Sequence, residues 1–347
     1  MHKIIYPIFF ILLLLSACDR DEPTTINGET PVVRMESNFS VVVEEEVVYG
    51  EGLGHDHSST SAFAVPLKLD IYYPENNDFN RPAFMFIHGG GFQGGTKTKP
   101  EIVAMANYFV SRGWVFASID YRTTEEMGTI SGMSPAEVVT FYSGIAPPTW
   151  INFALQNATS PDEVKTSTAM YAAQRDAKAA LRWLIANAGT YGINTDFITV
   201  GGASAGAVSA VALGISDPED FTDEISLADD PTLATTNLNA SYAVKSLVYF
   251  WGSNVKLELL EQVYGFNRYD SNDPELFLAH GTADANPTTT FSEAVELNAL
   301  YDSTGVYSEL VPLEGEGHGA WTARVNGKSL SELSFDFMVA RQGLELE

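Results

Sequence analysis

The sequence predicts an α/β domain built on a mostly parallel sheet with helices on both faces. Short apolar runs typical of buried strands alternate along the chain with longer stretches of helical spacing, as in parallel sheets that are covered on both sides. Of the 347 residues, 45% are hydrophobic, which is enough to bury a substantial core in one large domain. We therefore expect one domain over residues 37–347.

The expected elements follow one another in a regular order. Residues 41–48 and 67–72 have the pattern of an opening antiparallel strand pair, and residues 83–87 form an apolar run that ends at a glycine loop. The other expected strands are residues 115–119, 197–200, 246–250, 275–279 and 307–311. The expected helices are residues 101–112, 168–188, 205–215, 292–301 and 329–341.

Residues 1–17 have the features of an export signal. Lys3 supplies a positive charge, and the apolar residues 4–15 are fewer than the roughly 20 that a membrane-spanning helix needs. The segment ends in Leu-Ser-Ala-Cys, which resembles a bacterial lipobox, whose cysteine receives a diacylglyceryl group. We expect lipidation at Cys18 and an exported protein anchored to a bacterial cell membrane, on its periplasmic or cell-surface side. An ordinary secretory signal cleaved nearby is the alternative.

Charge and cysteine content narrow the possible partners. Cys18 is the only cysteine, so no intramolecular disulfide can form. The net charge of −26, from 19 Lys and Arg against 45 Asp and Glu, argues against nucleic acid as a partner. Residues 18–36 are polar and include two prolines, which predicts a tether between the anchor and the domain.

A candidate nucleophile lies in the Gly-Ala-Ser-Ala-Gly motif of residues 202–206. The motif follows the expected strand 197–200 and opens the expected helix 205–215, which is the context of a G-x-S-x-G nucleophile elbow. So tight a turn needs small neighbours because its backbone is strained. A helix N-cap serine is the alternative for an isolated match, but the strand-turn-helix context favours Ser204 as a nucleophile.

A glycine loop, His-Gly-Gly-Gly-Phe at residues 88–92, ends an earlier strand. Acyl transfer builds negative charge on the carbonyl oxygen, and losing one backbone N–H that stabilises it costs about 3 kcal/mol. The spacing of Gly90 and Gly95 also fits a phosphate loop, but Thr96 stands where that motif needs lysine. Residues 201–206 do not match the dinucleotide motif either.

A serine nucleophile needs a base, and the chain has six histidines. His318 lies in a glycine-rich loop after the last expected strand, from which an imidazole can reach the serine. His280, at the end of a strand, is the rival. The others fall in the signal segment, before the sheet or in the glycine loop, namely His2, His55, His57 and His88.

The orienting carboxylate should lie between the serine and the histidine, at another strand end. Asp284 has that position, 80 residues after Ser204 and 34 before His318. A turn-capping role is the alternative for this residue, and the preceding strand end has no carboxylate before Glu258. Weaker substitutes are Asp270, Asp273, Glu314 and Glu316. The order Ser, Asp, His is more specific than any one motif.

With these motifs in place, the chain resembles the HGGG-type serine esterases of the α/β-hydrolase fold, including carboxylesterases, hormone-sensitive-lipase-like esterases and acetyl xylan or feruloyl esterases. The resemblance runs from about residue 67 to residue 321. It implies that the amides of Gly90, Gly91 and Ala205 form the oxyanion hole. Ala203 replaces an acidic residue of several subfamilies, which leaves the subfamily open.

Three further residues fit the resemblance without a role in the chemistry. Asp120 and Arg122 follow an expected strand, and Asp176 lies on the helix before the elbow. We interpret all three as scaffold contacts beneath the site.

Two insertions interrupt the pattern. Residues 123–167 carry four aromatic residues that suit a lid or an acyl-pocket wall, although packing within the insertion explains them equally well. These are Phe141, Tyr142, Trp150 and Phe153. Residues 216–242 are acidic, and a solvated loop is favoured over a calcium site at Asp217, Asp220, Asp229 and Asp230. We expect no metal there or at His55 and His57, and no cofactor.

Together these features predict a serine carboxylic-ester hydrolase that acts on short-chain acyl esters or on acetylated or feruloylated carbohydrates. Its partners would be a small-molecule or glycan ester and, through the anchor, a membrane. A peptidase or amidase on the same fold is one alternative. The other is a surface lipoprotein that keeps the fold only to bind glycans or proteins, which would have no need for all three catalytic groups.

Overall fold

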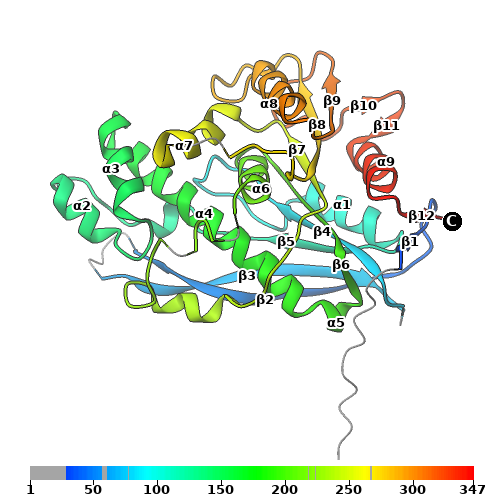
Figure 1. Ribbon diagram of the computed structural model, residues 1–347, viewed down its shortest axis with the longest axis horizontal. Coiled ribbons are helices and arrows are strands. Elements are labelled where there is room, and N and C mark those ends of the chain that lie inside the picture. Colours follow the sequence, from blue (N-terminus) through cyan, green and yellow to red (C-terminus); the bar gives the residue numbers. More distant parts are fainter. Residues whose placement is uncertain (1–28, 57–60, 77, 218, 223, 266–267) are drawn as a thin grey trace, which may run out of the picture.

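The computed structural model describes residues 29–56, 61–76, 78–217, 219–222, 224–265 and 268–347. Over these residues the main feature is an eight-stranded sheet in the order β2-β3-β5-β4-β6-β7-β8-β9 (Figure 1). Strand β3 pairs antiparallel with β2 and β5, and every other neighbouring pair is parallel. The expected mostly parallel α/β architecture is confirmed.

Every expected strand is present in this sheet. The strands are β2 (Val41–Gly54), β3 (Phe63–Pro74), β4 (Arg81–Ile87), β5 (Val115–Ile119), β6 (Ile193–Ala203), β7 (Ser246–Phe250), β8 (Glu275–Gly281) and β9 (Ser308–Leu313). The helices are α1 (Pro100–Val110), α2 (Pro135–Phe141), α3 (Pro148–Asn157), α4 (Pro161–Ala186), α5 (Ala188–Tyr191), α6 (Ala205–Ile215), α7 (Asn254–Tyr264), α8 (Phe291–Thr304) and α9 (Leu330–Gln342). Short pieces are η1 (Thr124–Glu126), η2 (Pro231–Thr235), β10 (Arg324–Val325) and β11 (Lys328–Ser329).

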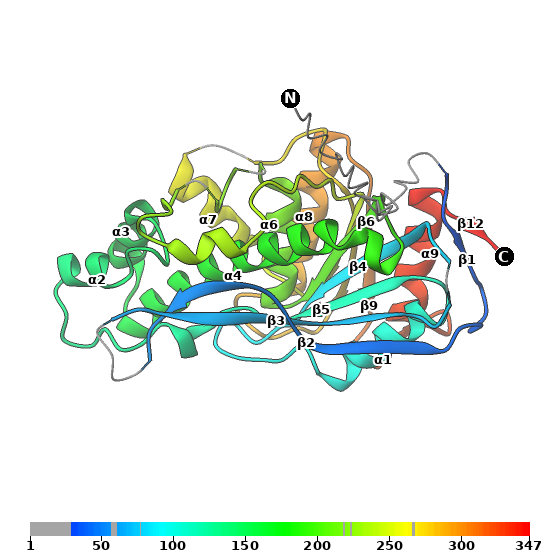
Figure 2. The ribbon, with the colours of Figure 1, turned by 90° about the horizontal axis from the view of Figure 1, so that it is seen from below.

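The sheet has a hydrophobic core on each face. On β4, Ala83, Met85 and Ile87 enter the core shared with α4, α6 and α8, whereas Phe84 and Phe86 enter the core shared with α1 and α9. This alternation follows from the two-residue period of a strand. Helices α1 and α4 lie on opposite sides of the long strands β2 and β3 (Figure 2). Both faces of the sheet are therefore covered, and the site can form only at its ends.

Helix α4 begins seven residues before the expected start at residue 168. Its N-terminal cap is Ser160, whose side chain accepts a hydrogen bond from the backbone of Glu163, and Pro161 occupies the first turn. Serine followed by proline is a strong helix-start signal, so the earlier start could have been read from the sequence. Helices α2, α3 and α7 were also not expected.

The end of the expected tether is docked on the domain. Residues Val32–Val33 form β1, which pairs in parallel with β12 (Glu345–Leu346), and Val33 is fully buried. Figure 1 shows the two short strands side by side. The expected signal segment and Cys18 lie outside the described residues. In the part of the chain that the structure describes, no helix has both the length and the apolar character needed to cross a membrane.

Candidate active site

The Gly-Ala-Ser-Ala-Gly motif forms a sharp turn between β6 and α6. Ser204 has φ 54° and ψ −120°, a conformation that costs backbone strain in a residue with a side chain. A Cβ atom on Gly202 would lie 2.2 Å from the carbonyl oxygen of Gly206, and one on Gly206 would lie 2.0 Å from that of Ile87. Only glycine fits these two positions. The strand-turn-helix context expected from the sequence is present.

Ser204, His318 and Asp284 lie in one chain of hydrogen bonds. His318 Nε2 is 3.0 Å from Ser204 Oγ, and His318 Nδ1 is 2.8 Å from Asp284 Oδ2. A carboxylate only accepts hydrogen bonds, so Nδ1 carries the proton and Nε2 is free to accept the serine proton. Three residues far apart in the sequence are thus brought together in the arrangement that acyl transfer requires.

Asp284 stays ionised in this position although it is largely buried. Burial would raise the pKa of Asp284, but hydrogen bonds from the Asn286 backbone, at 3.0 Å, and from His318 and His280 outweigh it and lower the pKa. A charged carboxylate stabilises the imidazolium that forms when His318 takes a proton. The Asp-x-Asn spacing is a turn signal that could have pointed to Asn286 from the sequence.

The loop that carries His318 is fixed across the end of β8. Ala283 donates its backbone N–H to Glu316 O at 2.9 Å, and Gly315 donates to Thr282 Oγ1 at 2.9 Å. A Cβ atom on Gly281 would lie 2.4 Å from Glu316 O, so the two loops approach too closely for any larger residue. The base and its carboxylate therefore sit on loops that are bonded to each other.

Two of the three expected oxyanion donors line the same cavity as Ser204. Gly91 and Ala205 lie on its wall, and Ala205 begins α6, where the first backbone N–H groups have no intrahelical acceptor. Gly90 is set back from the cavity lining, with φ 139° and Gly94 O only 1.9 Å from where its Cβ would be. The oxyanion role of Gly90 therefore stays a prediction, while Gly91 lies in the cavity beside the nucleophile.

Buried polar contacts hold the glycine loop from beneath. His88 Nδ1 donates to Gly89 O at 2.8 Å, and the Tyr121 hydroxyl donates to His88 O at 3.0 Å. Asp120 accepts the backbone N–H of Lys97 at 2.7 Å and lies 3.4 Å from His88 Nε2. Asp120 therefore lies beneath the loop, as expected for a scaffold contact.

A buried ion pair joins the strand end at Arg122 to helix α4. Arg122 Nη2 lies 2.6 Å from Asp176 Oδ1, and the guanidinium also donates to Leu53 O at 2.8 Å. Both partners are almost fully buried and satisfied, which fits a structural role rather than a role in the reaction.

The cavity beside Ser204 has a volume of about 450 Å³ and a mixed lining. Its apolar side is formed by Phe153, Ala154, Met170, Val208 and Leu259, from α3, α4, α6 and α7. Its polar side is formed by Asn157, Thr166, Lys256, Asn286 and Thr288. The first expected insertion thus contributes one wall, through α3 and the start of α4.

The four aromatic residues of that insertion have different surroundings. Tyr142 and Trp150 are buried, and Trp150 Nε1 donates to Ser167 O at 2.8 Å. Phe141 stacks on the His55 ring with centroids 3.8 Å apart. Of the four, Phe153 faces the cavity with Ser204. Packing within the protein accounts for Phe141, Tyr142 and Trp150, whereas Phe153 is placed where it could contact a substrate.

The acidic second insertion is less solvated than expected. Asp230 is buried and lies 3.0 Å from Arg175 Nη1, and Asp220 forms an ion pair with Arg268. Asp217 is exposed, as expected for a surface loop. Among the residues that the structure describes, no group of three or more His, Cys, Asp or Glu side chains could hold a metal ion.

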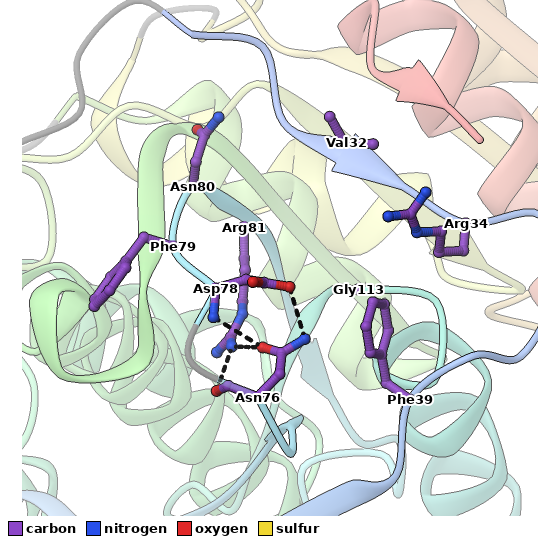
Figure 3. Close-up of a pocket in the computed structure, with 9 residues that line it drawn as sticks. All are labelled: Val32, Arg34, Phe39, Asn76, Asp78, Phe79, Asn80, Arg81 and Gly113. Carbon is purple, nitrogen blue, oxygen red and sulfur yellow. Dashed lines mark hydrogen bonds between the residues drawn. The ribbon is translucent and has the colours of Figure 1, made fainter.

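A second hollow, of about 370 Å³, lies at the opposite end of β4 (Figure 3). Its central cation, Arg81, donates to Tyr191 O at 2.9 Å and to Asn76 O at 3.1 Å. No serine, cysteine or histidine lines this hollow. This hollow therefore lacks a nucleophile and a base of the kind found beside Ser204.

Comparison with known proteins agrees with a site at Ser204 and the glycine loop. The BD-FAE family model matches residues 69–136 and 159–260, which contain the glycine loop and Ser204. The search of the curated proteins gave no match.

Solved structures share the fold at low sequence identity. A truncated carbohydrate esterase from gut microbiota has a TM-score of 0.56 and 17% identity, covering 91% of this chain and 100% of its own. Propionate-bound esterase 2 from Thermogutta terrifontis has a TM-score of 0.55 and 23% identity, covering 85% and 93%. The same esterase phosphorylated by paraoxon has a TM-score of 0.54 and 21% identity, covering 86% and 94%. On the family match, the shared fold and the elbow that carries Ser204, this chain is a serine esterase of the α/β-hydrolase type.

Proposed function

We propose that the chain hydrolyses carboxylic esters through an acyl-enzyme on Ser204, with His318 as the base and Asp284 as the orienting carboxylate. The observation that carries this proposal is the unbroken hydrogen-bond chain of 3.0 Å and 2.8 Å that joins the three side chains. The pKa of Asp284 is lowered, so the carboxylate is charged over the pH range in which the imidazole acts as a base.

The reaction proceeds in two steps. His318 Nε2 takes the Ser204 proton as the hydroxyl oxygen attacks the ester carbonyl, and the resulting oxyanion accepts hydrogen bonds from the amides of Gly91 and Ala205. The imidazolium then gives its proton to the leaving alcohol. Water, deprotonated by the same imidazole, attacks the acyl-enzyme and releases the carboxylic acid together with free Ser204.

The cavity supports a substrate with an apolar acyl group and a polar alcohol. Its apolar side, with Phe153 and Met170, suits a short-chain or aromatic acyl group, and its polar side, with Asn157 and Thr166, suits the hydroxyls of a sugar. The carbohydrate esterase and the propionate-bound esterase among the structural neighbours support the same choice. Acetylated or feruloylated carbohydrates and short-chain acyl esters are therefore the proposed substrates.

The direct test is an ester panel that varies acyl length, includes acetylated and feruloylated sugars and pairs each ester with its matched amide. Wild type should hydrolyse esters in preference to amides, and Ser204→Ala should abolish hydrolysis without loss of folding, because the turn already accommodates alanines on both sides. Ser209→Ala, which removes a buried hydroxyl from the same helix, is the matched control. Hydrolysis that persists in Ser204→Ala, or a preference for amides, would contradict the proposal.

We also propose that the chain is lipid-anchored through Cys18, with the cavity opening away from the membrane. The backbone oxygens of Glu29 and Thr30 accept hydrogen bonds from Asn194 and Asn80, next to the starts of β6 and β4. Ser204 follows the other end of β6, so the cavity beside it lies at the end of the sheet remote from these contacts.

If Cys18 carries the anchor, wild type should partition into detergent, and Cys18→Ser should be released in soluble form with unchanged esterase activity. Wild type found entirely in the aqueous phase would contradict the anchor.

A further inference from the structure

Asp284 is held by more partners than a catalytic triad requires. Its Oδ2 atom lies 2.8 Å from His318 Nδ1, 3.1 Å from His280 Nε2 and 3.2 Å from Thr289 Oγ1. Thr289 Oγ1 also lies 3.0 Å from His318 Nδ1. Three donors thus converge on the oxygen that faces the base. His280, the rival for the base in the sequence, lies behind the carboxylate and has no exposed surface.

The contacts of His280 fix its protonation. Its Nε2 lies 2.7 Å from the carbonyl oxygen of Thr289, which can only accept, so Nε2 carries a proton that is shared with Asp284. Its Nδ1 is buried without a hydrogen-bond partner among the described residues. Burial lowers the pKa of His280. The ring is therefore a neutral donor, and it has no exposed surface and is not part of the cavity lining, so it does not contact substrate.

Other ionisable groups on the surrounding elements are engaged elsewhere or lie outside hydrogen-bond range of Asp284. Glu293, on α8, accepts the backbone N–H of Val255 at 2.7 Å. Glu314, after β9, lies 3.5 Å from Thr282 Oγ1. Among the described residues, three further groups on these elements have no hydrogen bond to Asp284, namely the buried phenol of Tyr249 on β7, the exposed side chain of Glu316 and the half-buried Lys256 of α7. The donors to the carboxylate are therefore the Asn286 backbone N–H on Oδ1 and the three side-chain donors on Oδ2, and only the latter act on the oxygen that faces His318.

We propose that His280 is a positioning residue that, together with Thr289, orients Asp284 and sets the pH at which His318 acts as the base. Each hydrogen bond to Oδ2 withdraws negative charge from the oxygen that stabilises the His318 imidazolium. Less charge at that oxygen stabilises the imidazolium less, so we expect the enzyme to stay active to lower pH than a variant that lacks these donors. This inference rests on the proposed function.

The first test is His280→Phe, which keeps a ring in the buried site and removes the donor. We expect kcat/KM at the optimum pH to fall about tenfold, a loss of the size seen when a hydrogen-bond partner that orients an active-site side chain is removed. We also expect the acid limb of the pH profile of kcat/KM to move upward by about half a pH unit, because imidazolium is stabilised more strongly. A residue that only fills space would lower activity without moving that limb.

Two further variants serve as controls for this shift. His280→Gln can place an amide N–H near the position of Nε2, so its acid limb should stay at the wild-type pH. Tyr249→Phe removes a buried hydroxyl that has no hydrogen-bond partner among the described residues, from a ring 6.4 Å from His280, and should also leave the limb unchanged. Equal shifts in His280→Phe and His280→Gln would overturn the role of the donor.

Thr289→Val tests independently whether hydrogen-bond donation to Asp284 Oδ2 shifts the acid limb. It is the deciding variant if His280→Phe does not fold. It removes the hydroxyl that lies 3.2 Å from Asp284 Oδ2 and keeps the side-chain volume. Its acid limb should also move upward. An acid limb at the wild-type pH in Thr289→Val, together with no shift in His280→Phe where that variant folds, would overturn the proposal.

A spectroscopic measurement separates this inference from the proposed function. The proton on His318 Nδ1 should give a low-field proton resonance in the free protein, assigned by its loss in His318→Ala. The resonance should move further downfield in His280→Phe and in Thr289→Val, since a less solvated carboxylate makes a stronger hydrogen bond. If wild type hydrolyses no ester, the proposed function fails while this response is still measured. If esters are hydrolysed and the resonance does not move, the positioning role is wrong.

Discussion

The nucleophile elbow and the apolar cavity wall border the same space, but they depend on the sequence in different ways. The elbow requires glycine at positions 202 and 206, because Cβ atoms there would lie 2.2 Å and 2.0 Å from backbone oxygens. The wall depends on side chains that are present, and Phe153, Met170 and Leu259 come from three different helices. The elbow is a local backbone requirement, whereas the wall is a product of tertiary packing.

The two regions should therefore tolerate different substitutions. A side chain added at Gly202 or Gly206 would move backbone that is shared by β4, β6 and α6, so it should affect folding and chemistry together. A change in the wall removes contacts that only some substrates use, so it should alter specificity and leave the reaction intact. The following predictions test this separation, beginning with the catalytic groups themselves.

The largest effect is expected for Asp284→Asn, which alters chemistry without altering shape. An amide cannot hold His318 in the tautomer that frees Nε2, and it does not stabilise the imidazolium, so kcat should fall by about 10⁴-fold. Circular dichroism and thermal unfolding should remain near wild type. Asp302→Asn, on the exposed side of α8, is the control and should keep full activity. A loss below tenfold in Asp284→Asn would mean that another carboxylate orients the base.

The next largest effect is expected for Gly206→Ala, which should disrupt folding and activity together. The added Cβ would lie 2.0 Å from Ile87 O, a backbone atom that cannot move away alone, so the free energy of unfolding should fall by about 3 kcal/mol or more. Gly214→Ala, on the same helix, meets only the flexible end of Leu247 at 2.7 Å. Chemical denaturation should show a much smaller change there, and equal losses would contradict the backbone argument.

A smaller and selective effect is expected for Phe153→Ala. Removing this part of the wall should lower kcat/KM for aromatic or longer acyl esters by about tenfold, the usual consequence of losing one apolar contact. We expect the kcat/KM of acetyl esters to change little, because their acyl group is the smallest of the panel. The check is a comparison of kcat/KM across the acyl panel. Equal losses on all esters would show that Phe153 supports the fold rather than specificity.

The smallest effect is expected outside both regions, at Asp273, which precedes β8 at the end remote from the site. Burial raises its pKa from 3.8 to about 7. The wild type therefore loses stability as the pH rises from 3.8 to about 7, because over that range the carboxyl is ionised in the unfolded chain and protonated in the folded one. Asp273→Asn should be more stable by about 1 kcal/mol at pH 8, a value reduced for partial exposure, and equal to wild type below pH 4. Urea unfolding at both pH values measures this, and a difference independent of pH would contradict it.

Much of the sheet and the positions of the site residues could be predicted because they rest on local patterns. Strands buried on both faces are continuous apolar runs, and the elbow is marked by its small residues. Ser204, Asp284 and His318 each follow a strand, so the shared edge of a parallel sheet brings them together. Local pattern and tertiary structure agree at these points.

The wall and the partners of the carboxylate could not be predicted in the same way. Helix α7 contributes Leu259 to the wall, but its apolar residues have no motif that sets them apart from other amphipathic segments. The position of His280 behind Asp284 depends on how the loop from β8 folds back, and Thr289 reaches Asp284 only in that fold. Such contacts depend on tertiary structure, which no short pattern encodes.

The most direct test of the central claim is labelling of the purified protein with a fluorophosphonate, followed by intact-mass measurement and peptide mapping. The account predicts one adduct per chain, on Ser204, with loss of ester hydrolysis in proportion to labelling, and no adduct on Ser204→Ala. Labelling on a different residue, or ester hydrolysis that continues in the fully labelled protein, would contradict the assignment of Ser204 as the nucleophile.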